Sequence, residues 1–185
     1  MEILPYNLPE GWVWLKLKEL NRRSKSSNIK PFNFKDEIFE SYSVPIFPTG
    51  EPEEVEGGTI KSSKQILNEG DILICKINPR INRVWVVKKK TKYRQIGSSE
   101  WIVITPFSVV IPKYLVGICQ SSYFRHLLTS NGSDVGGSLT RARPKEVIHY
   151  PIPLPPLQEQ HRIVAKLDRL LGKVQTAQAL SLIHI

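Results

Sequence analysis

The sequence lacks the residues that mark several protein classes. It has two cysteines, Cys75 and Cys119, each inside an apolar run and without a second cysteine or a histidine at ligand spacing. Because a free cysteine packs as a small hydrophobe, we expect both to be buried thiols. The four histidines form no H-x-x-x-H pair, so the sequence predicts no zinc site.

Long apolar runs are also missing. No window approaches the roughly 18 consecutive apolar residues that a membrane span needs. The first residues, MEILPYNLPEGW, lack the basic-then-apolar order of a signal peptide. We therefore expect a cytoplasmic protein that makes no membrane contact.

Catalytic signatures are absent as well: the sequence has no G-x-S-x-G elbow, no recognisable Cys/His pair, no G-x-G-x-x-G after a strand and no Walker pattern. The acidic run EPEEVEGG (51–58) suggests carboxylates for a nuclease metal. No lysine-bearing strand follows it at short spacing, so we interpret it as a solvated loop. The sequence predicts no catalytic residue, no metal and no cofactor on this chain.

Positive charge is what the sequence has in excess. Lysine and arginine outnumber aspartate and glutamate by 26 to 17, a net charge of +9 that favours a polyanionic partner, with nucleic acid first. The stretch from Lys76 to Arg94, KINPRINRVWVVKKKTKYR, holds eight basic residues and no acidic one. We interpret this stretch as a DNA-contacting segment. The alternative interpretation is a solvated strand edge, where lysine deters aggregation.

Three stretches are candidate DNA contacts. The turn NPRIN within the basic stretch carries side chains that can pair with base edges or phosphates, the Gly-rich GGSLTRARPKE (136–146) can approach a phosphate closely, and GSSEWIV (97–103) is a weaker candidate. For the second and third, an ordinary loop is the alternative. The predicted contacts are Lys76, Asn78, Arg80, Asn82, Arg83, Lys88, Lys89, Lys90, Lys92, Arg94, Ser98, Ser99, Thr140, Arg141 and Arg143.

Hydrophobic patterning predicts an α/β (α+β) domain with a mixed, largely antiparallel sheet and flanking helices. Strands are predicted where β-branched and aromatic residues gather between Gly, Pro and Asn, and helices where apolar residues recur at helical spacing. The predicted strands are 70–77, 83–89, 100–106 and 107–111. One or two helices are predicted within 113–132, a short helix near 14–20, a further turn after Pro144, and a loop at 24–37.

The chain closes with PIPLPPLQEQHRIVAKLDRLLGKVQTAQALSLIHI (151–185). Four prolines in six residues argue against a regular element there, whereas Pro155, Pro156 and Glu159 favour a helix start. Apolar residues then alternate at spacings of four and three, which predicts a protruding helix with a coiled-coil seam for a partner helix. The seam residues are Ile163, Leu167, Leu170, Val174 and Ala177. The alternative is a helix folded back on its own domain, and we divide the chain into 1–154 and 155–185.

The motifs LPEGWVWLKLKEL, GDILICKINPRINRVWVV, GSSEWIVI, GGSLTRARPKEV and PIPLPPLQEQHRIVAKLDRLL together resemble the DNA-specificity subunit of type I restriction-modification systems. The resemblance implies target-recognition domains, each followed by a helix, with two such helices paired antiparallel to set the distance between half-sites. It also implies that methyltransferase subunits supply S-adenosylmethionine, and that a separate restriction (motor) subunit uses ATP with Mg²⁺ and cuts the DNA.

The resemblance covers only one recognition domain and one helix. The chain would then be either a half-length subunit or a shortened piece of a longer one. In both cases the resemblance implies a non-catalytic scaffold that recognises one half-site of double-stranded DNA, and the exposed helix predicts a homodimer if two copies pair. A helix from Leu157 to about Leu180 would span roughly 36 Å, close to one DNA turn. The alternatives are a stand-alone DNA-binding protein, or a methyltransferase or nuclease whose active site the motifs do not reveal.

Overall fold

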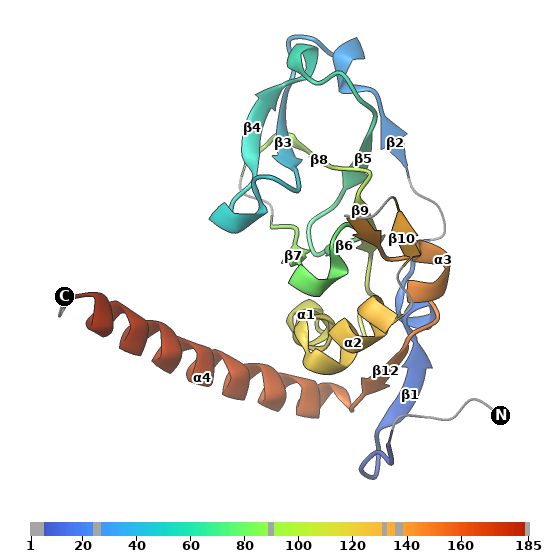
Figure 1. The fold of residues 1–185 in the computed structure, drawn as a ribbon, viewed down its shortest axis with the longest axis vertical. Helices are drawn as coiled ribbons and strands as arrows, with labels where there is room; N and C mark the ends of the chain where they lie inside the picture. The colour runs from blue at the N-terminus through green and yellow to red at the C-terminus, as the bar shows by residue number, and fades with distance from the viewer. Residues whose placement is uncertain (1–5, 24–26, 89–90, 131–132, 136–138, 184–185) are drawn as a thin grey trace.

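The computed structural model describes the chain except for residues 1–5, 24–26, 89–90, 131–132, 136–138 and 184–185. It has the predicted mixed α/β architecture with largely antiparallel sheets. In Figure 1 the five-stranded sheet lies uppermost, two helices lie below the three-stranded sheet, and the C-terminal helix runs out to one side.

The five-stranded sheet has the order β2-β5-β8-β3-β4. Its strands are β2 (Asn28–Ile29), β3 (Ile38–Tyr42), β4 (Glu53–Glu56), β5 (Lys64–Leu67) and β8 (Arg94–Gly97). β3 and β8 are parallel, and the other neighbours are antiparallel. Two predicted loops, 24–37 and 51–58, therefore contribute strands. The glutamates of β4 favoured a loop in the sequence prediction, but an edge strand tolerates charged side chains that face solvent.

The three-stranded antiparallel sheet has the order β7-β6-β9, and its strands are β6 (Ile72–Cys75), β7 (Val84–Val86) and β9 (Trp101–Ile104). These three strands were predicted. The strand predicted at 107–111 is wrong, because that segment turns: Val110 N–H donates to the Phe107 carbonyl at 3.0 Å. Phe107 and Val109 are exposed, so β-branched composition there does not reflect a sheet.

An aromatic cluster joins these two sheets. The Trp101 indole of β9 donates to the Tyr42 carbonyl of β3 at 2.7 Å. Trp85 of β7 packs edge-to-face against Tyr42, with ring centroids 4.8 Å apart. Edge-to-face aromatic pairs contribute beyond their buried area, so the cluster fixes how one sheet sits on the other.

The main core lies between the three-stranded sheet and the helices α1 (Pro112–Gln120) and α2 (Ser122–Ser130), both of which were predicted. The predicted turn after Pro144 is α3 (Pro144–Val147), with proline in its first turn. The predicted short helix is a 3-10 helix (Leu17–Leu20). Buried residues from all these elements contact one another, including Leu17, Leu20, Ile72, Ile74, Leu115, Cys119, Phe124, Leu128 and Val147.

The proline-rich stretch forms a regular strand, contrary to expectation. β12 (Pro151–Leu154) pairs antiparallel with β1 (Val13–Lys16), with Leu15 opposite Ile152. In an antiparallel pair only alternate residues direct their N–H toward the partner. The two prolines of β12 alternate with Ile152 and Leu154, so the missing donors cost no ladder bond on this two-stranded edge.

Two tyrosines hold β12 against the helices. The Tyr114 hydroxyl of α1 donates to the Pro153 carbonyl at 2.6 Å, and the Tyr123 hydroxyl of α2 donates to the Pro151 carbonyl at 2.9 Å. Desolvation by burial, aided by Tyr6, raises the pKa of Tyr123 to about 12. Both hydroxyls therefore remain protonated donors at neutral pH, because burial also raises the pKa of Tyr114.

The last helix, α4 (Leu157–Ile183), begins directly after this strand. Gln160 is 1 % exposed and binds three backbone groups: it accepts from Ile111 N–H at 2.8 Å and donates to the Val109 and Pro155 carbonyls at 3.0 Å. Ile163 and Val164 pack against the main core. The first turns of α4 therefore belong to the globular part. Figure 1 shows the rest of the helix extending away from it.

The remaining two strands, β10 (Ser133–Val135) and β11 (Leu139–Arg141), pair antiparallel beside α3. β11 also forms a bridge with the end of β6, at Ile77 opposite Arg141. This bridge brings the Gly-rich motif into contact with the basic stretch.

Candidate nucleic-acid interface

Three segments that are far apart in sequence meet at the end of β6. Lys76 N–H donates to the Glu100 carbonyl at 2.9 Å, and the Lys76 carbonyl accepts from Ala142 N–H at 2.9 Å. Asn78 N–H donates to the Thr140 carbonyl at 2.9 Å. The backbone itself therefore brings the three predicted contact stretches together on one surface.

This surface is hollowed by two neighbouring cavities that share Lys76 and Pro144. One of about 570 Å³ is lined by Lys76, Arg141, Ala142, Arg143, Pro144, Lys145 and Glu146. The other, of about 450 Å³, is lined by Arg23, Asn28, Gln65, Lys76, Ser99, Trp101, Ile102, Val103, Pro144 and Ile148. We call the two cavities together the basic groove and refer to Lys76, Arg141, Arg143 and Lys145 as the groove cations; Arg23, which also lines the groove, is paired with the buried Asp71.

Two of the four groove cations are paired with carboxylates. Arg141 donates to Glu100 at 3.1 Å, and Arg143 donates to Glu146 at 3.0 Å. Both arginines are substantially exposed, and exposed pairs contribute only about 0–1 kcal/mol. Phosphate oxygens could therefore replace these carboxylates at low cost, and among the described residues Lys76 and Lys145 have no ion-pair partner.

The turn NPRIN forms the loop that leaves the groove toward β7. Its centre is a 3-10 helix (Pro79–Ile81), and the Arg80 side chain is exposed. The Asn82 amide, predicted to face DNA, is turned inward and donates to the Cys119 carbonyl at 3.0 Å. Arg83 is half-buried and donates to the Ile77 carbonyl at 3.4 Å. Of these predicted contacts, Arg80 is the one that points freely into solvent.

The rest of the basic stretch lies elsewhere. Arg94 of β8 forms a two-point ion pair with Glu37 and lies over the ring of Phe34, 4.5 Å from its centroid. Its hydrogen bonds to Glu37 raise the pKa of Arg94. Lys92 and Arg94 line a separate cavity of about 380 Å³ that shares no residue with the basic groove. The fold thus divides the continuous basic stretch between two surfaces.

The other predicted contacts differ in position. Ser98 and Ser99 form the turn between β8 and β9, where Ser98 Oγ accepts from Glu100 N–H at 3.2 Å and Ser99 lines the groove's second cavity. Lys88 is exposed, and its carbonyl accepts from the Tyr42 hydroxyl at 2.8 Å. The predicted contacts Lys89 and Lys90 lie outside the described residues. Lys145, which was not predicted, follows Arg143 at a spacing of two within the same motif.

Cysteine and other metal-ligating side chains are dispersed in the described part of the chain. Cys75 and Cys119 are buried free thiols, as predicted, and desolvation raises the pKa of each. Within the described ranges no group of three His, Cys, Asp or Glu side chains could hold a metal ion. Among those same residues, no helix is long and apolar enough to cross a membrane.

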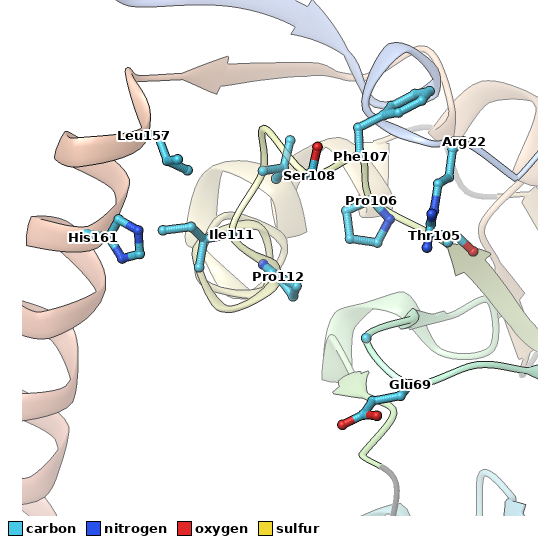
Figure 2. Close-up of a pocket in the computed structure, with 12 residues that line it drawn as sticks. Arg22, Glu69, Thr105, Pro106, Phe107, Ser108, Ile111, Pro112, Leu157 and His161 are labelled. Carbon is cyan, nitrogen blue, oxygen red and sulfur yellow. The ribbon is translucent and has the colours of Figure 1, made fainter.

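A further cavity, of about 400 Å³, lies where α4 joins the globular part. Figure 2 shows Leu157 and His161 of α4 on one side of it and Arg22, Thr105 and Glu69 on the other. None of the predicted DNA contacts lines it. Sequence reasoning missed this cavity because its walls come from segments without a shared motif.

Known proteins match this chain over almost its whole length. The family model for the type I restriction modification DNA specificity domain matches residues 9–181. The chain belongs to this specificity family. It is 31% identical over 180 residues to the type I restriction enzyme EcoEI specificity subunit and 29% identical over 179 residues to the EcoAI specificity subunit, both from Escherichia coli. These alignments cover 90% and 91% of the chain but 29% of each relative.

Solved structures of the specificity family agree with the fold. The HsdS subunit from Thermoanaerobacter tengcongensis has a TM-score of 0.81 and 27% identity, over 95% of this chain and 46% of that chain. A chain from a study of complex assembly and conformational transition of the type I R-M system has a TM-score of 0.79 and 28% identity, with the same coverage. This chain therefore spans less than half the length of its solved relatives.

Proposed function

We propose that this chain is a DNA-recognition module of a type I restriction-modification system, reading one half-site of a bipartite target in double-stranded DNA. The observation that carries the proposal is the convergence of three separate segments on the basic groove in a chain of the specificity family. Exposed cations fix a protein on the duplex through phosphates, and neighbouring loops then read base edges. Residues 1–154 would recognise DNA, and residues 155–185 would form the spacer and assembly helix.

Binding to a fluorescent pool of random 30-base-pair duplexes, followed by anisotropy between 50 and 200 mM salt, tests the groove. Lys76→Ala with Lys145→Ala should weaken binding and lower the salt slope by about 0.9 per lost phosphate contact. Lys18→Ala with Lys61→Ala is the matched control, because it removes the same charge from exposed positions outside the groove that were not predicted to contact DNA.

A larger loss for the groove pair would support the proposal. Equal losses for the two pairs would mean that affinity follows net charge, which would contradict a specific role for the groove. The prediction that Lys88 and Lys92 contact DNA is tested in the same assay, because Lys88→Ala with Lys92→Ala should then lose more affinity than the control pair.

The chemistry of the system would lie on partner subunits in the cytoplasm. A methyltransferase subunit would hold S-adenosylmethionine, and a restriction subunit would use ATP and Mg²⁺, so this chain would act as their scaffold. Methyl transfer measured with radiolabelled S-adenosylmethionine should then require the methyltransferase subunit. Transfer by the chain alone, with contaminating enzyme excluded by mass spectrometry, would contradict this assignment. Failure to co-purify with either subunit would favour a stand-alone DNA-binding protein.

We also propose that two copies pair through α4. Beyond its docked turns the helix exposes Leu170, Leu171 and Val174, and an apolar seam of this kind favours a partner helix. Leu170→Glu with Val174→Glu should convert a dimer to a monomer in light scattering at tens of micromolar protein. Ala165→Glu with Thr176→Glu adds the same charge outside the seam and should leave the mass unchanged. A monomeric mass for the unmodified chain would overturn the pairing.

A further inference from the structure

The loop from Asn78 to Asn82 has an unusual backbone. Asn78 and Asn82 have φ values of 48° and 51°, and they are the only non-glycine residues with positive φ in the described part of the chain. The left-handed region is unfavourable for residues that carry a Cβ, although asparagine tolerates it better than most. Such conformations persist where the surroundings hold them, and they gather at functional sites.

Contacts on both sides hold this loop in place. Asn78 N–H is bound by the Thr140 carbonyl of β11, and the Asn82 amide is bound by the Cys119 carbonyl in the last turn of α1. Two internal bonds of 3.0 Å close the turn, from Ile81 N–H to the Asn78 carbonyl and from Asn82 N–H to the Pro79 carbonyl. Pro79 is buried beneath the turn. The loop is therefore rigidly placed.

This rigid turn presents two different side chains to solvent. Arg80 is exposed, and Ile81, a branched apolar residue, is 56% exposed. The loop follows directly from Lys76 and Ile77, which connect it to the basic groove, and its 3-10 helix packs against α2. A cation and an apolar side chain held side by side at a phosphate-binding surface match the contacts that read DNA: a charged group for phosphate or guanine, and a methyl-bearing group for thymine.

We infer that Ile81 reads a base of the bound duplex by contacting the 5-methyl group of a thymine in the major groove, and that Asn82 is a positioning residue that holds it there. The inference rests on the DNA-recognition function proposed above. It replaces the expected base-reading role of Asn82, because the amide of that residue is already committed to the Cys119 carbonyl. Arg80 supplies the neighbouring polar contact.

The first experiment selects bound sequences from the random 30-base-pair pool with the full chain and sequences them. The unmodified chain should enrich a motif, and Ile81→Ala should lose preference at one or two adjacent positions only. Val109→Ala is the matched control, because Val109 is 59% exposed, β-branched and outside the groove. This control should return the unmodified motif.

Failure of the inference and failure of the proposed function give different results. If Ile81→Ala returns the unmodified motif, the inference is overturned while DNA recognition stands. If the unmodified chain binds no DNA, or binds every sequence alike, sequence recognition fails and the inference falls with it.

The second experiment replaces thymine by deoxyuridine at the affected position, which removes only the methyl group. The unmodified chain should bind the deoxyuridine duplex about fourfold more weakly, the loss expected for one desolvated methyl group. Ile81→Ala should bind the two duplexes equally. Equal binding by the unmodified chain would overturn the thymine contact. If the fluorescence of a 2-aminopurine base placed beside that position also increases on binding, Ile81 is instead inserted as a wedge between bases.

The role of Asn82 is tested with Asn82→Asp, which keeps a residue tolerant of positive φ and removes the amide donor. A positioning residue should lose preference at the same positions as Ile81→Ala, with the rest of the motif intact. A residue with only a structural role would lower affinity evenly across all sequences, and that result would overturn the assignment.

Discussion

The two halves of α4 carry the same apolar rhythm and have different surroundings. In the first half, Gln160 is buried, Ile163 packs on the core, and a methyl group of Leu167 lies against Gly117 of α1. In the second half, Leu170 and Val174 are 47% and 53% exposed. An apolar seam on a helix therefore does not determine which surface packs against it. Here the contacts with α1, at Lys113 and Gly117, mark where the covered part of the seam stops.

The comparison also bears on the two alternatives for this helix. α4 packs on its own domain as far as Asp168 and extends beyond the domain after it, whereas a partner helix for the exposed part stays a prediction. Gly117 of α1 marks this packed contact, since a Cβ at that position would be in van der Waals contact with a Leu167 methyl carbon at 3.4 Å. Docking fixes the direction in which the free half leaves the domain.

Of the substitutions that test the contrast between the docked and the exposed half of α4, Gln160→Ala should have the largest effect on stability. It would leave the Ile111 N–H without its acceptor, and the Val109 and Pro155 carbonyls without the amide donor; the bond to Pro155 is buried and the other two are part-buried. Unsatisfied buried groups cost about 1–3 kcal/mol each, so we expect a loss of about 3 kcal/mol in the free energy of unfolding, measured with urea. Gln158→Ala, two residues earlier and exposed, should change it by less than about 0.5 kcal/mol. Equal effects would mean that the docked half is not anchored by Gln160.

Ile163→Ala compared with Val174→Ala measures the contrast along the seam itself. Ile163 is half-buried against the core, so its truncation should cost about 1.5 kcal/mol, below the roughly 2–5 kcal/mol of a fully buried site. Val174 is exposed, so its truncation should leave the unfolding free energy of the monomer nearly unchanged. Measurement at a protein concentration where light scattering gives a monomer keeps assembly out of the result. Comparable losses would show that the free half is also packed.

The ion pair at the boundary should matter least. Lys113 Nζ lies 2.7 Å from the Asp168 carboxylate, and both side chains are exposed. Surface pairs contribute about 0–1 kcal/mol, so Lys113→Ala, Asp168→Ala and the double variant should give a coupling energy below about 0.5 kcal/mol in a double-mutant cycle. A coupling well above 1 kcal/mol would make this pair, rather than Gln160 and Ile163, the anchor of the docked half.

The sequence by itself determined several local features. The strands β6, β7 and β9, the helices α1 and α2, the helical turn after Pro144 and the two buried thiols were predicted from pattern and composition. So was membership of the specificity family, because its motifs are local strings of residues. Local propensity and periodicity are enough to predict an element where the pattern within one segment indicates which of its residues are buried.

Only the tertiary structure decided what distant segments do together. It made a strand of the prolines by pairing β12 with β1, it placed Lys76 beside Arg141 and away from Arg94, and it turned the Asn82 amide toward α1. Each of these outcomes depends on a partner far along the chain. The sequence of a single segment does not determine which neighbour will hydrogen-bond its backbone groups or place further charges beside its own. That pairing is set by the packing of the whole domain.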